Sequence, residues 1–326
     1  MENVVDLLRF SKGFLGRRVV SHLISLDYQV RMGIMAAGSF GVPQFRQRVF
    51  LWGARLGKKL PPYPLPTHEA DVKGGQGLPK PLVLRDALSD LPKVENGEMR
   101  DAIPYGPNSH RLNDFQRYIR LNKTGQGQTA ELYDHRPLKL NEDDYQRVRR
   151  VPKKKKAFFF DLGGVIKDEE GKWMIDPSKP RKLLKSKSPL VPEYALTFEK
   201  GKSKKPFGRL WWDETVSTVM TRAEPHNHRL LHPKQDRVLS VRENARLQGF
   251  PDHYRLCGDV KDKYTQVGNA VAVPVGKALG YALALSVNGL CDDGPLVKLP
   301  ANFTFAIGPL TPPVVENDQQ SSDIVQ

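Results

Sequence analysis

The sequence has little cysteine and no long apolar stretches. Only two cysteines, Cys257 and Cys291, occur in 326 residues, and they form neither the spacing of a metal site nor a disulfide framework. No apolar run is long enough to span a bilayer, and no secretory signal begins the chain. The sequence therefore predicts a protein of a reducing, intracellular compartment, without a membrane span and without a metal.

Apolar residues are also scarce, at 39% of the chain, whereas proline (26) and glycine (27) are plentiful. A chain of this length forms one large or two ordinary domains. The low apolar fraction and the many loop-forming residues predict extensive loops around a modest core.

The net charge of +15 is concentrated in one segment. Residues 145–210 hold 19 Lys and Arg against 7 Asp and Glu, and 19 − 7 gives +12. Two interpretations stay open. The segment is a solvated, partly disordered loop, or it attracts a polyanion, for which nucleic acid is the common intracellular candidate.

The first 60 residues have the pattern of an α/β domain. Apolar residues near helical period predict one amphipathic helix within residues 1–28, weakened by two glycines. Alternation predicts a strand at Tyr28–Ala36, and an apolar run predicts a buried strand at Arg48–Ala54. Helix, strand, turn and strand indicate the end of an α/β domain.

The middle of the chain, from residue 60 to about 235, loses this regularity. Proline-rich sequence predicts loops. We expect one short helix at 86–91 and a strand pair within Leu210–Arg222. Beyond Val287 the periodicity ends, which predicts a disordered tail.

Residues 235–286 predict two buried helices. The first starts in VRENARLQGF and is stopped by Gly249-Phe250-Pro251, and a longer apolar run extends from Gln266 to Leu285. RENARLQGFPD followed by QVGNAVAVPV resembles motifs IX and X of the DNA (cytosine-5)-methyltransferases. The resemblance covers most of residues 1–286.

Two earlier segments resemble further motifs of that family. Glu2-Asn3-Val4 is similar to motif VI, in which the Glu holds and protonates the ring of a flipped cytosine. Gln44-Phe45-Arg46-Gln47-Arg48 matches motif VIII, Gln-x-Arg-x-Arg. The resemblance implies that Glu2, Arg46 and Arg48 are catalytic, with Arg46 reaching the cytosine carbonyl oxygen and Arg48 supporting the site. Asn3 and Gln44 would support the geometry.

Motif X implies a binding site for S-adenosyl-L-methionine. In the family its backbone lines the cofactor pocket, here at Gly268, Asn269 and Val271, with Gly268 allowing close approach to the ligand. For Arg242 and Arg246, which share one face of the motif IX helix, a structural role is expected.

The resemblance also implies a domain plan. The fold would be α/β, with an incomplete Rossmann-like methyltransferase sheet and an inserted, loop-rich target recognition domain. Residues 1–58 would form the second half of the catalytic domain and 59–234 the recognition domain. Residues 235–288 would provide the motif IX and X helices, and 289–326 the tail. Lys153, Lys154, Lys155 and Lys156 are candidate contacts to double-stranded DNA, whereas the nearby tryptophans are expected to pack in the core.

The sequence around residues 1–17 and 133–155 is similar to plant chromomethylases, which implies DNA methylation in the nucleus. Motif I and the Pro-Cys nucleophile of motif IV are absent, as is a chromodomain that would contact nucleosomes. We therefore expect a carboxyl-terminal portion that is inactive alone. An incomplete gene model, a truncated product and one half of a split enzyme all remain open, as does a catalytically inactive DNA-binding or regulatory protein.

Overall fold

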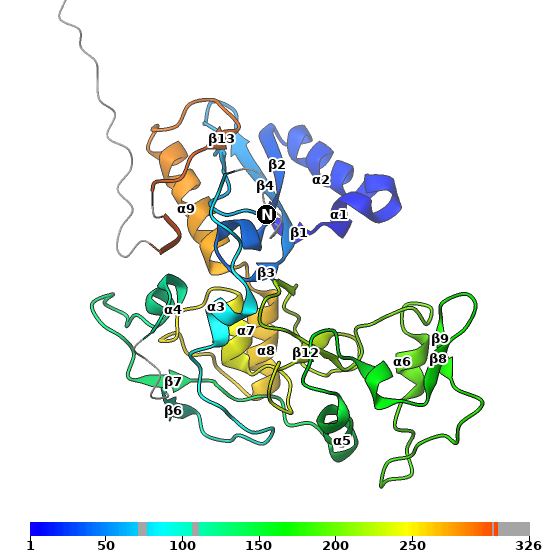
Figure 1. The fold of residues 1–326 in the computed structure, drawn as a ribbon. Coiled ribbons are helices and arrows are strands. Elements are labelled where there is room, and N and C mark those ends of the chain that lie inside the picture. Colours follow the sequence, from blue (N-terminus) through cyan, green and yellow to red (C-terminus); the bar gives the residue numbers. More distant parts are fainter. Residues whose placement is uncertain (71–76, 106–110, 302, 306–326) are drawn as a thin grey trace, which may run out of the picture.

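The computed structural model describes residues 1–70, 77–105, 111–301 and 303–305. Figure 1 shows two lobes, one above the other. We call residues 1–70 and 273–305 the sheet lobe and residues 77–272 the second lobe, within the described ranges. The chain thus leaves the sheet lobe, forms the second lobe and returns.

The sheet lobe is built on three antiparallel strands. They are β1 (Glu2–Val4), β4 (Gln47–Arg55) and β2 (Tyr28–Ala36), in the order β1-β4-β2. The strand predicted at 28–36 is confirmed, and the one predicted at 48–54 is extended by a residue at each end. The α/β fold class expected from the sequence is thereby observed.

The helix expected over residues 1–28 is interrupted. The structure has α1 (Asp6–Arg9), the 3-10 turn η1 (Phe10–Gly13) and α2 (Phe14–Ser25). Ser11, Lys12 and Gly13 have positive φ values of 47°, 53° and 81°, so the backbone reverses there. Residues with positive φ cannot continue a right-handed helix. The helix is therefore interrupted near the glycines that were expected to weaken it.

The apolar run near the carboxyl end also forms two helices rather than one. α8 (Val260–Asn269) begins before the predicted start, and α9 (Val273–Val287) follows after an extended Ala270. Pro274 lies in the first turn of α9, where its missing N–H is tolerated. Within the sheet lobe, α9 contacts η2 (Ala37–Phe40) and β5 (Tyr63–Pro64).

The second lobe surrounds α7 (Val241–Leu247), whose residues are all buried. α3 (Leu84–Leu88) and α8 pack against α7. Ser240 and Glu243 form a capping box at its start, and Gly249 (φ 79°) follows its end. The helix ends at Leu247, just before the Gly249-Phe250-Pro251 stop expected from the sequence, because this glycine reverses the chain.

Short elements complete the second lobe, and they are more helical than the sequence predicts. The helices are α4 (Asp114–Ile119), α5 (Glu142–Arg150), α6 (Glu193–Thr197) and η3 (Phe159–Leu162). The strands are β6 (Ala102–Pro104), β7 (Glu131–Tyr133), β8 (Val165–Lys167), β9 (Trp173–Ile175), β10 (Gly208–Arg209), β11 (Val216–Ser217) and β12 (Arg229–Leu231).

The strand pair expected within 210–222 does not form. β10 pairs with β12, and β11 instead pairs in parallel with β3 (Gln44–Phe45) of the sheet lobe. Residues 210–222 therefore do not form a hairpin. Their strand β11 pairs with β3, which is distant in sequence, and so connects the two lobes.

The expected tail is partly folded. β13 (Leu296–Val297) pairs in parallel with β5, η4 (Phe303–Phe305) follows, and Leu299 and Phe303 are buried. The remaining predicted tail, residues 306–326, lies outside the described part of the chain. In the described residues no single helix is long and apolar enough to cross a membrane; α8 and α9 satisfy that test only together, as a pair bent by 43°.

Candidate functional site

Glu2 and Arg48 form an ion pair across neighbouring strands. β1 and β4 place them close together, and Arg48 Nε lies 3.0 Å from Glu2 Oε1. The side chains are 29% and 16% exposed, so the pair is open to solvent on one side. A carboxyl group and a guanidinium at a partly open site could contact the edge of one planar, polar ligand.

Arg46 has different contacts. Its Nη1 donates to the carbonyl of Val219 (3.1 Å) and its Nη2 to that of Gly268 (2.9 Å), and the residue is 3% exposed. Burial, and then the charge of Arg48, lowers the pKa of Arg46 to about 10, while Glu2 opposes this effect. Arg46 therefore stays charged at neutral pH but points into protein. Arg48 is therefore the more solvent-accessible of the two arginines.

The two predicted support residues are placed differently. Gln44 is fully buried at the lobe junction and contacts Val219, Leu247 and Gln248. Asn3 is exposed, and its Oδ1 accepts only a local bond from the backbone N–H of Val4 (2.8 Å). Gln44 therefore joins distant segments, whereas Asn3 affects β1 alone.

Motif X lies at the end of α8 and the following turn. A Cβ on Gly268 would meet the backbone N of Thr221 at 2.5 Å and the carbonyl carbon of Met220 at 2.6 Å. The close approach expected at this glycine is therefore to protein backbone rather than to a ligand. Asn269 is exposed. Val271 borders a small cavity that Arg46 and Arg48 also line.

The arginines of motif IX are structural, as expected. Arg246 pairs with Asp90 and Asp252, both at 2.6 Å, and its side chain is 0% exposed. Arg242 pairs with Asp134 at 3.3 Å, also at 0% exposure. Buried guanidinium groups need such partners, because an unpaired charge in the interior is very costly.

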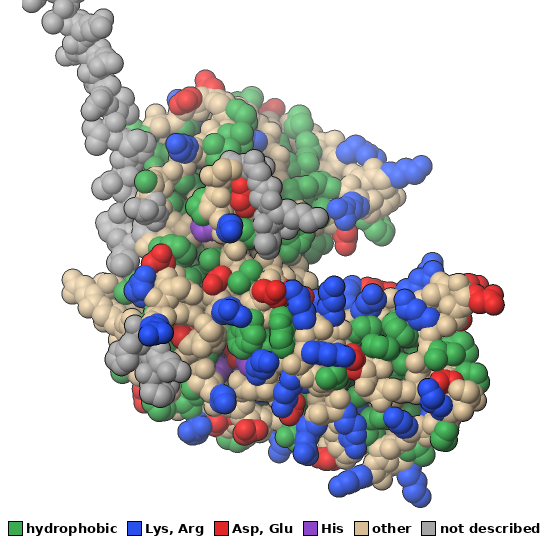
Figure 2. Space-filling model, viewed as in Figure 1, with side chains coloured by type: hydrophobic (Ala, Val, Ile, Leu, Met, Phe, Trp, Pro, Cys, Tyr) green, Lys and Arg blue, Asp and Glu red, His purple; other side chains and the backbone are tan. Residues whose placement is uncertain are grey.

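The lysines predicted to contact DNA are on the surface of the second lobe. Lys153, Lys154 and Lys155 pair with Asp236, Asp161 and Asp213 at 2.8–2.9 Å. Exposed pairs of this kind are weak and exchangeable. Figure 2 shows Lys and Arg side chains spread over the viewed face of this lobe, including the edge that faces the sheet lobe. Such a surface remains attractive to a polyanion.

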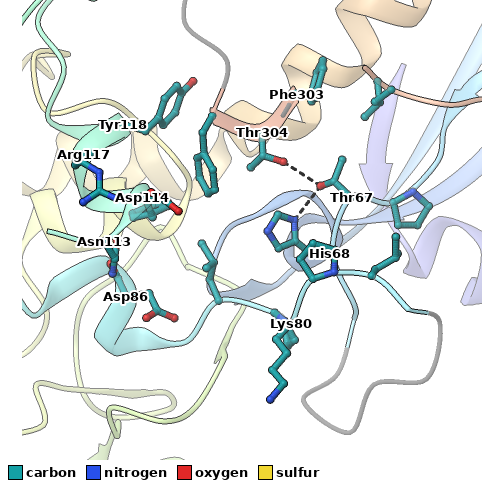
Figure 3. Close-up of a pocket in the computed structure, with 18 of the residues that line it drawn as sticks. Thr67, His68, Lys80, Asp86, Asn113, Asp114, Arg117, Tyr118, Phe303 and Thr304 are labelled. Carbon is teal, nitrogen blue, oxygen red and sulfur yellow. Dashed lines mark hydrogen bonds and ion pairs between the residues drawn. The ribbon is translucent and has the colours of Figure 1, made fainter. Parts of the chain in front are cut away.

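A larger cavity of about 1180 Å³ opens elsewhere between the lobes. Figure 3 shows Tyr118 and Asn113 on one side and Thr67, His68 and Thr304 on the other. The cavity shares no lining residue with the Glu2–Arg48 pair. Nothing among the described residues identifies a ligand for it, and size alone does not make it the reactive site.

Neither cysteine contacts the candidate site. Cys257 is exposed in the loop before α8, where Gln266 bonds its backbone, and Cys291 is buried near Lys59. The described residues contain no group of three or more His, Cys, Asp or Glu side chains arranged to hold a metal ion.

Sequence reasoning missed Gln248 and Val219, which bind the predicted motif residues from the second lobe. Polar residues throughout the motif IX helix were the available signal, since buried polar groups require defined partners. The partners themselves are up to 204 positions apart, and no local pattern reveals them.

The motifs and the α/β fold define a class of protein. A sequence profile of the C-5 cytosine-specific DNA methylases matches residues 1–284. The chain belongs to this family.

Curated relatives within the family are plant chromomethylases. Rice DNA (cytosine-5)-methyltransferase CMT1 is 53% identical over 94% of this chain and 31% of its own length. CMT3 from Arabidopsis thaliana is 50% identical over 94% of the chain and 39% of its length. The chain thus spans about a third of these relatives.

A solved structure shares the fold. The crystal structure of a DNA modification methyltransferase encoded within an E. coli prophage matches with a TM-score of 0.52 at 19% identity. The match covers 88% of this chain and 68% of that one. At this identity the likeness concerns the fold alone.

Proposed function

We propose that the chain is part of a chromomethylase that methylates carbon 5 of cytosine in nuclear DNA. The observation that carries the proposal is the ion pair between Glu2 of motif VI and Arg48 of motif VIII, at 3.0 Å. Two motifs 46 positions apart (48 − 2) meet on adjacent strands as base recognition requires. The relatives are named as plant DNA (cytosine-5)-methyltransferases, and a DNA substrate supports the nuclear location.

In the proposed reaction the chain acts on the edge of a flipped cytosine. Glu2 gives a proton to ring nitrogen 3, and Arg48 neutralises charge on the adjacent carbonyl oxygen. Both effects make carbon 6 open to attack by a thiolate, which activates carbon 5. Arg46, Gln44 and Asn3 would hold the geometry without touching the base.

S-adenosyl-L-methionine would supply the electrophilic methyl group. Val271 and its neighbours on the turn before α9 would form part of its pocket, because they border the cavity beneath Arg46 and Arg48. Asn269 is exposed beside this turn and is available to a ligand. Gly268 would contribute indirectly, since its neighbours are Met220 and Thr221.

We assign the segment 59–234, most of which lies in the second lobe, to target recognition. It holds the +12 segment and the lysines 153–156, which would exchange their carboxylate partners for DNA phosphates. Residues 1–58 with the helices of 235–288 would then form the catalytic side. A nucleosome contact through a chromodomain would belong to another part of the complete protein.

For the 326-residue chain alone we favour DNA binding without methyl transfer. Its two cysteines lie away from the Glu2–Arg48 pair, so no thiolate is placed for attack. The test measures transfer of tritiated methyl groups to duplex DNA by this chain, with and without the amino-terminal portion that its relatives carry. Transfer only with that portion supports the proposal. Transfer by the chain alone would contradict it, and Cys257→Ser and Cys291→Ser would then identify the nucleophile.

A further inference from the structure

The two lobes are joined by a buried relay of side-chain amides. Gln44, on β3, donates from Nε2 to the Gln248 side-chain oxygen (2.7 Å) and to the carbonyl of Leu247 (3.1 Å). Its own oxygen accepts from the backbone N–H of Val219 (2.7 Å). Gln44 and Gln248 are both 0% exposed. One side chain of the sheet lobe thus binds two separate segments of the second lobe.

Gln248 continues the relay toward the motif X turn. Its Nε2 donates to the carbonyls of Val267 (2.8 Å) and Ala270 (3.2 Å), and its backbone carbonyl accepts from the N–H of Val273 at the start of α9 (2.8 Å). Each amide has one orientation that satisfies all partners, because the carbonyl groups only accept and the N–H group only donates. The relay therefore has a fixed polarity.

Arg46 reinforces the same junction from the next inward-facing position of the chain. Gln44 binds the N–H of Val219 while Arg46 binds its carbonyl, so this residue is held at both backbone groups. Arg46 also binds the carbonyl of Gly268, which has no room for a side chain. β3 and β11 pair directly beside these contacts.

We propose that Gln44 and Gln248 are positioning residues that hold residues 216–222 of the second lobe at a fixed place relative to the Glu2–Arg48 pair. Arg48 follows Gln44 by four residues along the same strand-forming segment. A displacement of the relay therefore changes the position of residues 216–222 relative to the Glu2–Arg48 pair. The role of the relay in catalysis rests on the proposed function. Its role in fixing the positions of the two lobes does not depend on that function.

The experiment measures the distance between the lobes in the 326-residue chain. Cys257 is exposed in the second lobe and Cys291 is buried, so Ser25→Cys at the end of α2 gives one label position in each lobe. Spin labels at 25 and 257 report the distance distribution. Gln248→Met keeps the size of the side chain and removes its polar atoms, and Gln44→Asn is a milder change that shortens the amide. Gln29→Met is the control, because Gln29 makes its two bonds at the surface.

We expect a clearly broader distance distribution for Gln248→Met and Gln44→Asn, with far-UV circular dichroism unchanged, and no broadening for Gln29→Met. Affinity for duplex DNA should fall about two- to thirty-fold in the same two variants, the range for substitutions along a coupling network. An unchanged distribution in a folded Gln44→Asn variant would overturn the inference, even if Gln248→Met fails to fold. Broadening without DNA binding by any variant, wild type included, would instead reject the proposed function and leave the relay standing.

Discussion

The second lobe seals the ion pairs around α7 from solvent, whereas the sheet lobe leaves the Glu2–Arg48 pair partly open. Arg246 and Asp252 are both 0% exposed, while Glu2 remains 29% exposed beside Arg48. Apolar side chains are also exposed on the sheet lobe. Phe10 is 64% exposed and Ile34 is 51% exposed in the sheet lobe. The sealed pairs hold the interior of the second lobe together. The open pair and the exposed apolar side chains of the sheet lobe are available to contact a ligand or another chain.

The difference separates residues that act on a ligand from residues that maintain the fold. A sealed pair cannot reach a substrate, and its loss leaves a buried charge without a partner. An open pair adds little to stability because water screens it. Substitutions in the two pairs should therefore affect different measurements.

The largest effect is expected at the open pair. In the complete enzyme, Glu2→Gln and Arg48→Ala should each lower the rate of methyl transfer about 10²- to 10⁴-fold, the usual contribution of a positioned acid or base. The free energy of unfolding should change by no more than about 0.5 kcal/mol. Initial rates with tritiated cofactor and urea unfolding measure the two quantities. A variant that loses stability but keeps its rate would show that the pair is structural.

The next effect is expected at the sealed pair. Arg246→Met should lower the free energy of unfolding by about 3–5 kcal/mol, because Asp90 and Asp252 then lose their buried cation. Urea denaturation of the chain followed by circular dichroism measures this. Arg100→Met is the matched control, since its pair with Glu98 is on the surface, and it should cost less than about 1 kcal/mol. Equal losses in both variants would remove the distinction between sealed and open ion pairs.

A smaller effect should appear as pH is lowered from 7 to 4.5. Burial lowers the pKa of His135 to about 4 and that of His232 to about 3, with Glu243 opposing and Arg237 adding to the shift. An unfolded histidine titrates near 6.5, so in this window the unfolded chain takes up protons that the folded protein does not. Stability therefore falls as pH falls, by about 2–3 kcal/mol for each histidine at pH 4.5.

Melting curves at pH 7.0, 5.5 and 4.5 check this prediction. His135→Asn should flatten part of the pH dependence, and His22→Asn, at an exposed position on α2, is the matched control. A wild-type stability that is constant across this range would contradict it.

Much of the fold was accessible from local pattern. The strand at 28–36 was predicted within its exact bounds because alternating side chains and an unbroken register leave one solution. The break at residues 10–13 and the division of the last apolar run were not predicted. Both depend on single backbone conformations, at Ser11 and Ala270, that composition does not determine.

The candidate site was predicted as a set of residues but not as a set of contacts. The resemblance to the family motifs implied Glu2, Arg46 and Arg48 as site residues, yet the different contacts of the two arginines depend on Val219 and Gly268. Those partners lie 173 and 222 positions from Arg46. Long-range hydrogen bonds of this kind follow from the complete fold, and a linear motif carries no record of them.

The smallest change in folding stability is expected on the exposed apolar surface of the sheet lobe. Met32 and Ile34 are 40% and 51% exposed on β2, so Met32→Ser combined with Ile34→Ser should alter the free energy of unfolding by about 0.5 kcal/mol or less per position. Self-association should nevertheless decrease, because exposed apolar side chains on an edge strand promote contacts between copies. Sedimentation velocity at several concentrations measures the association. The control is Ile166→Ser together with Met174→Ser on β8 and β9, where exposure is 39% at each position. If the second pair of substitutions reduces association as much as the first, self-association does not depend specifically on the sheet lobe. The comparison between the lobes then fails for exposed apolar surface but remains valid for their ion pairs.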